Sequence, residues 1–339
     1  MEASATTLGG GRLDLRRSPL GALPDRVLRW GLTVLAGGVL VLIGYFFVRL
    51  IGQSTDAFSS NGLSFVVGND WDVSRNIYHG APLLVGTLIT SGIALVIGVP
   101  VAVATALFLT EFCPRRVRGP LSILVDLLAA VPSVVYGLWG VFVLIPKLHG
   151  AEKWFASTFS FIPFIGGGSV AGPNYFIAGL ILAIMIVPIV SAISREVIAT
   201  VPAEHKEAAL ALGATRWEMI RTAVLPYSRA GITGGAMLGL GRAIGETIAV
   251  TLVIGNAPVI GKHLFDQGYT LAAVIANEFG EAAATPIHSS ALFAAGLVLF
   301  VFTLLVNVLA RWFVNRGERG HRGAGDAGLI APAAGEGTD

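Results

Sequence analysis

The chain has 339 residues, of which 54% are apolar and only 13% are charged, a charged share well below that of ordinary soluble domains. Its formal net charge of +2 gives no reason to expect a nucleic acid partner, and its one cysteine, Cys113, excludes an internal disulfide. A helix needs about 20 apolar residues to cross a bilayer. The apolar runs therefore predict an all-α multi-pass membrane protein with six transmembrane helices, near residues 28–51, 83–110, 120–145, 175–194, 230–257 and 288–313.

The two ends of the chain, residues 1–27 and 315–339, are rich in Gly, Ala and Arg, and we expect them to be disordered tails. The first apolar run is too long for the hydrophobic region of a cleaved signal peptide. Bulky aromatic residues and Arg49 follow it, where small residues would mark a cleavage site. We therefore expect residues 28–74 to form a first spanning helix with an outer loop.

Lysine and arginine are distributed unevenly between the two sides of these spans. Seventeen lie before residue 30, in residues 111–119, in residues 195–229 and from residue 311 onward, whereas the alternate loops hold four. Because loops rich in Lys and Arg stay in the cytoplasm, we expect both termini and these two loops to be cytoplasmic. The protein is accordingly predicted to lie in the plasma (inner) membrane.

Residues 204–226, EHKEAALALGATRWEMIRTAVLP, form a polar segment between two apolar runs. Gly213 can take the left-handed conformation that ends a helix. Thr215 lies three residues before Glu218, the spacing of a capping box, so a second helix can begin at once. Pro226 is expected to end or kink that second helix. The segment is therefore predicted to be a two-helix hairpin, and an ordinary surface hairpin remains the alternative to a docking element.

Glycines recur every four residues in the predicted helix 230–257, at Gly231, Gly235 and Gly239, and Gly241 and Gly245 repeat the spacing. Small residues at this spacing allow two helix backbones to approach closely. We interpret them as a helix-packing face.

Two charged residues, Arg242 and Glu246, lie within the same predicted helix, where each central charge costs roughly 2.5–3.5 kcal/mol. Being four residues apart, they are expected to share a face. We interpret them as part of a translocation pathway, because the planar fork of Arg suits oxyanions, with a structural ion pair as the alternative. Asp126, in the predicted helix 120–145, is a further intramembrane acid that we assign to the same pathway, and it is expected to pair with Arg242 or with another subunit.

Two glycine patterns resemble nucleotide-binding motifs but lack what the chemistry needs. The sequence NAPVIGK at 256–262 lacks the first Gly of a phosphate loop and is followed by His263 instead of Ser or Thr. The spacing of Gly239, Gly241 and Gly245 does not fit a dinucleotide fingerprint. The sequence also has no HExxH or GxSxG motif, so we expect no catalysis, no cofactor and no metal in this chain.

The stretch EAALALGA followed by LP, in a predicted cytoplasmic loop before the next-to-last span, resembles the coupling loop of ABC-importer permeases. Three further stretches resemble the PstC-type permeases of phosphate importers. They are AAVPSVVYGLWGVFVLIP (129–146), GRAIGETIAVTLVIGN (241–256) and TLAAVIANEFGEA (270–282). The resemblance covers roughly residues 75–314.

The resemblance implies the type I ABC importer permease fold and a set of partners. A sister permease, PstA, would complete the pathway, two copies of the ATPase PstB would bind from the cytoplasm, and the phosphate-binding protein PstS would dock outside. Inorganic phosphate would be the substrate, with Arg242 and Glu246 near its route. The residues that match the family's coupling motif are Glu207, Ala208, Ala209 and Gly213.

Alternatives remain open at this point. A permease for sulfate, molybdate or another solute would keep the same loop and change the pathway residues. An ion-coupled secondary transporter would have inverted repeats and broken midplane helices, and we see no such repeat in the sequence. A membrane-embedded enzyme lacks a credible set of catalytic residues.

Overall fold

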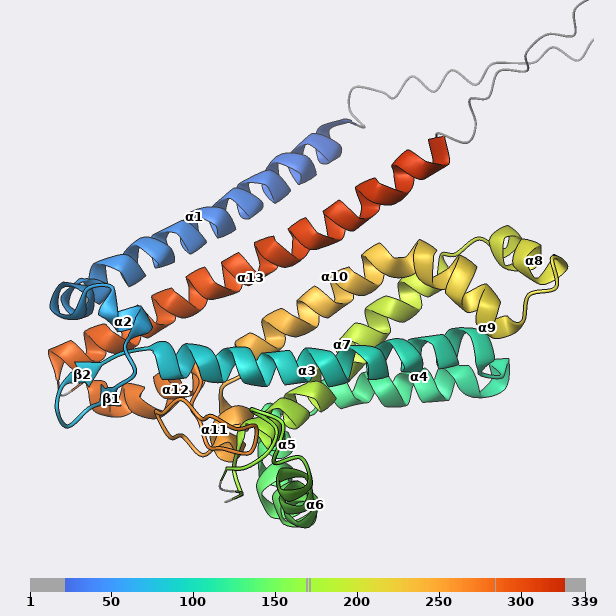
Figure 1. Cartoon of the computed structure of the whole chain (residues 1–339). Coiled ribbons are helices and arrows are strands. Elements are labelled where there is room, and N and C mark those ends of the chain that lie inside the picture. The colour runs from blue at the N-terminus through green and yellow to red at the C-terminus, as the bar shows by residue number, and fades with distance from the viewer. Residues whose placement is uncertain (1–21, 169, 171, 284, 327–339) are drawn as a thin grey trace, which may run out of the picture. The chain divides into compact units, whose positions relative to one another are not determined.

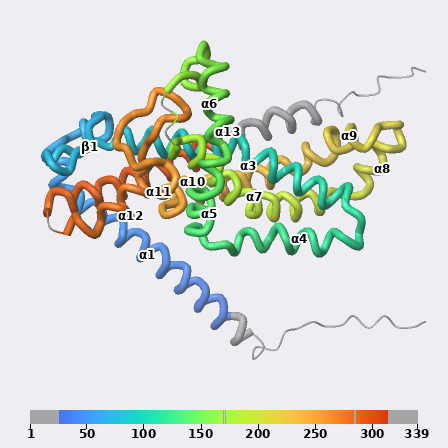
Figure 2. The backbone as a smooth tube through the Cα atoms, turned by 90° about the horizontal axis from the view of Figure 1, so that it is seen from below, coloured from blue at the N-terminus to red at the C-terminus, as the bar shows by residue number. Residues whose placement is uncertain are grey.

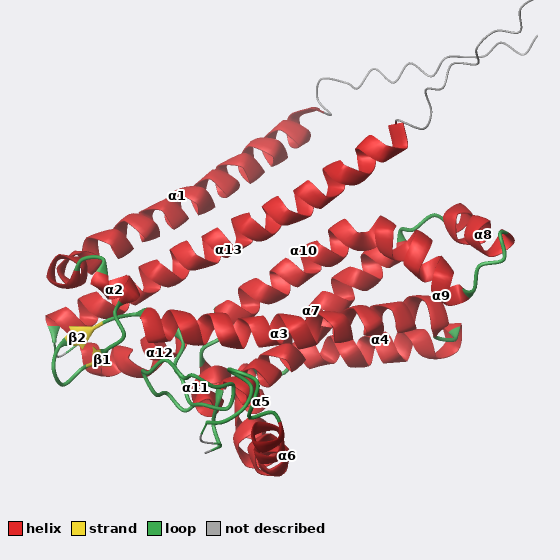
Figure 3. Cartoon of the chain, in the orientation of Figure 1, coloured by secondary structure: helices red, strands yellow, loops and turns green. Residues whose placement is uncertain are grey.

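The structure is a computed structural model that describes residues 22–168, 170, 172–283 and 285–326, with side chains from residue 26 to residue 312 within these ranges. The chain divides into two units, residues 1–50 and residues 51–339. The described residues are helical apart from connecting loops and one small pair of strands (Figures 1 and 3). The predicted all-α class is confirmed.

The first helix, α1 (Ala22–Asn61), has 40 residues and crosses the boundary between the two units. It begins before the predicted residue 28, so residues 22–27 are helical and not part of a disordered tail. These residues include the good helix formers Ala, Leu and Arg. At the other end of the chain, residues 315–326 are helical as well. The rest of both expected tails lies outside the described residues.

A short antiparallel strand pair precedes the main group of helices, with Trp71 opposite Tyr78. The elements in this part are α2 (Ser64–Val67), β1 (Trp71–Asp72), β2 (Ile77–Tyr78), α3 (Ala81–Leu107) and a π-helical turn, η1 (Phe108–Phe112). Pro82 lies in the first turn of α3, where its missing N–H is not needed.

The predicted continuous helix at 120–145 is wrong, because the chain breaks at residues 130–132. Pro132 is extended, with φ −58° and ψ 138°, and a proline also disfavours helical conformation in the residue before it. The elements on either side are α4 (Arg115–Ala129), α5 (Ser133–Trp139), the π-helical turn η2 (Gly140–Leu144) and α6 (Ile145–Thr158). Figure 2 shows that α6 runs in a different direction from α4.

The next helix, α7 (Tyr175–Ala199), begins at Asn174, whose side chain accepts a hydrogen bond of 2.9 Å from the backbone N–H of Ile177. It is followed by α8 (Ala203–Ala211), α9 (Arg216–Met219), the π-helical turn η3 (Ile220–Val224) and α10 (Leu225–Ile244).

Pro226 does not end the helix that begins at Arg216, so of the two outcomes expected from the sequence, an end or a kink, the first is wrong. The π-helical turn η3 lies directly before it, and Leu225 donates its N–H to the carbonyl of Ile220. A widened turn at this place gives room to a proline ring that would otherwise clash with the preceding turn. The helix therefore continues from Arg216 to Ile244.

The predicted helix 230–257 is also interrupted. It ends at Ile244, and α11 (Ile248–Ile254) follows at an angle of 65°. Gly245 occupies the end of α10, and glycine weakens a helix because it gains the most chain freedom on unfolding. The last elements are α12 (Leu271–Ala282) and α13 (Pro286–Asp326).

Five of the described helices are long and apolar enough to cross a membrane, or six if the bent pair of α10 and α11 counts as one span. The five are Arg26–Asn61, Ala81–Phe112, Ser133–Thr158, Tyr175–Ala199 and Pro286–Trp312. The predicted number of six is therefore reached when the bent pair is included.

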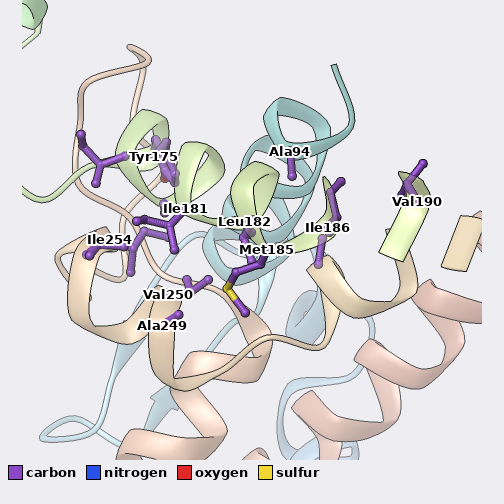
Figure 4. Close-up of a cluster of buried hydrophobic side chains, with 14 of the residues drawn as sticks. Ala94, Tyr175, Ile181, Leu182, Met185, Ile186, Val190, Ala249, Val250 and Ile254 are labelled. Atoms are coloured by element: carbon purple, nitrogen blue, oxygen red, sulfur yellow. The ribbon is translucent and has the colours of Figure 1, made fainter. Parts of the chain in front are cut away.

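The largest buried cluster in the second unit is built around α7, against α3, α10 and α11 (Figure 4). Ile181 and Ile186 of α7 are fully buried in it, together with Ala94 of α3 and Ala249 of α11. Because α7 is covered on several sides, it is apolar along most of its length and not on one stripe only.

Glycines bring α10 against α7, as their spacing predicted. A Cβ atom on Gly231 would lie 2.3 Å from Cγ2 of Val197, and one on Gly239 would lie 2.8 Å from Cγ2 of Val190. Both distances are too short for a real contact, so only glycine allows this approach. The helix-packing interpretation is confirmed for Gly231, Gly235 and Gly239, but not for Gly241, which has no atom within 4 Å of the position of an added Cβ.

Candidate functional site

The 204–226 segment is the two-helix hairpin that its sequence predicted. Gly213 lies between α8 and α9 with φ +84°, a left-handed conformation that favours glycine. The capping box is present: the Thr215 hydroxyl accepts from the N–H of Glu218 at 3.3 Å, and the Glu218 carboxylate accepts from the N–H of Thr215 at 2.7 Å. Figure 1 shows the hairpin at the same end of α7 and α10 as the turn from α3 to α4.

The second half of the hairpin is anchored in a buried apolar cluster. Met219 of α9 and Ile220 and Val224 of η3 pack there against the ends of α3 and α7. The buried members from those two helices and the following turn are Ala106, Leu107, Ile198 and Val201. This half of the hairpin is therefore closely packed on the helices that it contacts.

The first half, α8, has no buried residue. Of the residues that match the coupling motif, Glu207, Ala208 and Gly213 are exposed, and Ala209 is half-buried against the apolar cluster. Three large apolar side chains are also exposed on the hairpin, Leu210 at 44%, Leu212 at 90% and Trp217 at 61%. Exposed apolar groups next to a set of charged ones are typical of a surface that another protein covers.

An ion pair that sequence reasoning missed ties α8 to the end of α3. Lys206 Nζ lies 2.6 Å from Oε1 of Glu111, which belongs to the π-helical turn η1. The two residues are 95 positions apart, and no spacing rule connects them. The only signals in the sequence were an acid at the end of a predicted span and a lysine directly before Glu207.

Arg242 and Glu246 do not share a helix face, which corrects the expectation from their spacing. Arg242 lies in the last turn of α10 and is exposed, whereas Glu246 lies in the break before α11. Glu246 Oε1 accepts from the backbone N–H of Ala249 at 3.3 Å, so this carboxylate caps the first turn of α11. Within the described part of the chain, no ion pair joins Arg242 to Glu246.

Asp126 does not pair with Arg242 either. Its Oδ1 lies 2.5 Å from Nη2 of Arg195, so the pair joins α4 to α7 near the hairpin. The Asp126 side chain is 50% exposed, and Arg195 is 16% exposed. Its place at a helix–helix contact gives Asp126 a structural partner within the chain.

The exposed part of α10 borders open space. No atom lies within 4 Å of the position that a Cβ would take on Gly234 or Gly241. A groove of about 860 Å³ runs between α10 and α13, and both glycines line it. The same helix therefore packs tightly on α7 through one set of glycines and leaves another set uncovered.

One continuous helix joins the hairpin to Arg242. It runs from Arg216 in the hairpin to Ile244, two residues beyond Arg242. A displacement of α9 along the helix axis would therefore reach Arg242 directly. In the described residues there is no group of three or more His, Cys, Asp or Glu side chains that could hold a metal ion.

The chain matches the family described as "Binding-protein-dependent transport system inner membrane component" over residues 96–319. It is 44% identical over 300 residues to the phosphate transport system permease protein PstC of Mesorhizobium japonicum, a match that covers 87% of this chain and 91% of that protein. It is 40% identical over 309 residues to PstC 2 of Mycobacterium tuberculosis, covering 88% and 93%.

Among solved structures, the fold is similar to that of a bacterial alginate ABC transporter in complex with an alginate pentasaccharide-bound periplasmic protein. The TM-score is 0.58 at 17% identity, and the match covers 87% of this chain and 98% of that one. At this identity the likeness concerns the fold alone. The chain belongs to the family of binding-protein-dependent transport system inner membrane components and, within it, to the PstC-type phosphate transport system permeases.

Proposed function

We propose that this chain is the membrane permease subunit of an ATP-driven importer of inorganic phosphate. The observation that carries this proposal is the 44% identity, over nearly the full length of both chains, to a protein named as a phosphate transport system permease. Broken helices, which secondary transporters also have, occur at the α4–α5 and α10–α11 junctions, but the family assignment favours the ABC class.

In the proposed complex, a PstA-type sister permease supplies the other half of the pathway. Two PstB-type ATPases bind the hairpin from the cytoplasm, a PstS-type binding protein delivers phosphate from outside, and both termini are cytoplasmic. The exposed Leu212 and Trp217 and the motif residue Glu207 support the hairpin as the ATPase contact. The uncovered glycines of α10 support a close approach of the sister permease along that helix.

The proposed role of Arg242 is to bind phosphate during translocation. It is exposed on α10 and has no carboxylate partner among the described ion pairs, so its guanidinium donors are available to an oxyanion. Glu246 is proposed to hold the start of α11 and so to shape the pathway beside Arg242. Asp126, the third predicted pathway residue, is proposed to act through Arg195 and the α4–α7 contact.

The experiment is phosphate uptake by the whole importer, assembled with its three kinds of partner and reconstituted in vesicles. We expect ATP-dependent uptake of labelled phosphate that sulfate and molybdate do not compete for. The variant Arg242→Gln should assemble normally and lose uptake, because it removes a fixed positive charge from a low-dielectric path. Arg75→Gln, at an exposed ion pair in the β1–β2 turn, is the matched control and should transport normally.

Uptake of sulfate or molybdate in place of phosphate would overturn the substrate assignment. Uptake at the normal rate with Arg242→Gln would show that this residue is structural.

A further inference from the structure

The attachment of α8 to the rest of the permease raises a mechanical question. This helix carries Glu207 and Ala208, yet none of its residues is buried. Ala209 is half-buried, and the ring of His205 lies 6.1 Å from that of Tyr227 in α10. The described contact that fixes α8 to the end of the α3 span is the ion pair between Lys206 and Glu111. If the hairpin receives the motion of an ATPase, α8 needs a firm link to pass that motion on.

The geometry of the pair is that of a strong contact. Lys206 Nζ and Glu111 Oε1 are 2.6 Å apart, and their side chains are only 22% and 13% exposed. A charge pair that is mostly removed from water is screened less by salt than a surface pair. Removal of one partner is costly because it leaves the other charge partly buried and unpaired.

The end of α3 that carries Glu111 is fixed from its other side as well. Arg118 of α4 donates through Nη2 to the carbonyl oxygens of Thr110 at 2.6 Å and Cys113 at 3.4 Å. The π-helical turn η1 leaves such carbonyl groups without their usual helical partners. Because Arg118 donates hydrogen bonds to these carbonyl oxygens, the turn that carries Glu111 is held in place by α4.

We propose that the Lys206–Glu111 pair is a positioning contact that transmits the motion of α8 to α3 during the transport cycle. This proposal rests on the proposed function and adds a second route to it. The first route runs from α9 through η3 into α10 and Arg242. The second runs from α8 through the ion pair into α3, which packs on α7. With both routes intact, α3 and α10 move together when the hairpin moves.

The test uses the complete importer with four variants: Glu111→Gln, Lys206→Met, the double exchange Glu111→Lys with Lys206→Glu, and the control Arg75→Gln. We measure phosphate transported per ATP hydrolysed, together with co-purification of all subunits. The two single variants should still assemble and hydrolyse ATP. The amount of phosphate transported per ATP should fall about fivefold or more in each single variant. Fivefold is the lower end of the range of factors that couple two sites in a protein.

The double exchange restores an ion pair with reversed charges and should recover transport to within about twofold, since the contact and not either charge alone is required. Recovery of this kind separates a positioning role from a general loss of stability. Normal transport per ATP in both single variants would overturn the proposal. So would loss of the ATPase from the single variants, because the pair would then serve docking.

A second measurement does not depend on the transported ion. Spin labels placed at Ala203 of α8 and Phe108 of η1, both exposed, report the distance between the two helices. In the wild type this distance should stay narrow and unchanged through the ATP cycle, and in Glu111→Gln it should broaden. If the wild type fails to take up phosphate but the distance between the labels stays constant, the proposed substrate is rejected while the proposed Lys206–Glu111 contact stands. A distance that varies in the wild type would reject the contact.

Discussion

The two halves of the 204–226 hairpin are neighbours in sequence, but the structure holds them in opposite ways. α8 has no buried residue and is held by one partly buried ion pair, one half-buried alanine and one ring contact with α10. α9 and η3 begin with a capping box, enter a buried apolar cluster and continue without interruption into α10. A hairpin of this kind can present a free surface to a partner and still pass on a displacement, because its two halves do different tasks.

The largest loss of stability is expected from a substitution in the anchored half of the hairpin, α9 and η3. Ile220 is 1% exposed in the cluster between α3, α7 and η3. The variant Ile220→Ala should lower the free energy of unfolding by about 2–5 kcal/mol, because it removes buried methyl groups and leaves a cavity. Thermal unfolding of the purified chain in detergent measures this loss. An unchanged melting temperature would mean that the cluster does not hold the hairpin.

The next largest effect is expected at Gly213, which joins the two halves of the hairpin. Gly213 has φ +84°, and no atom lies within 4 Å of the position of an added Cβ. In Gly213→Ala only the backbone conformation is unfavourable, at a cost of about 1–2 kcal/mol. We expect a membrane-inserted protein whose ATP hydrolysis is uncoupled from transport, as also for replacement of Glu207. Gly150, in α6 with open space around it, is the matched glycine control. Full transport with Gly213 and Glu207 both replaced would rule out the coupling role.

The capping box gives a smaller effect on the anchored half. Thr215→Ala removes the hydroxyl that accepts from the first turn of α9, which typically costs about 1 kcal/mol. The helix should fray at its start while the cluster behind it stays intact. Hydrogen exchange of the amides in 216–219 measures the fraying. Thr222→Ala serves as control, since this exposed hydroxyl only donates within its own helix, to the carbonyl of Glu218.

The smallest effect on stability is expected on the exposed half. Leu212 is 90% exposed, so Leu212→Ala should change the free energy of unfolding by less than about 0.5 kcal/mol. The same variant should weaken binding of the ATPase, if the hairpin is its contact. Co-purification of the ATPase and the melting temperature of the chain together test the contrast with Ile220→Ala. A large loss of stability in Leu212→Ala would show that the end of the exposed half is packed.

The breaks in the spans show where sequence patterns reach their limit. The apolar runs predicted the helices at 83–110 and 175–194 well, because each run is bounded by polar or turn residues. They failed at Pro132, where the run stays apolar while the helix ends, and at Gly245, which lies between Arg242 and Glu246 inside the predicted span. Hydrophobicity reports where the chain prefers to be buried. It does not report the direction of the backbone.

The charged residues show the same limit. A spacing of four predicted that Arg242 and Glu246 share a face, a rule that holds only inside an unbroken helix. The break at Gly245 released Glu246 to cap α11 and left Arg242 exposed. The pairs of Asp126 with Arg195 and of Lys206 with Glu111 depend on which helix ends meet, and a single sequence carries no signal for that.

The sequence by itself determined the membrane class, the hairpin with its Gly213 joint and capping box, and the glycine face of α10. These are local features, fixed by composition and by spacings of three and four residues along one element. Only the tertiary structure decided which half of the hairpin is anchored, where the long spans break and that Arg242 pairs with neither Glu246 nor Asp126. The physical reason is that such choices depend on contacts between residues far apart in the chain, where packing and desolvation outweigh local preference.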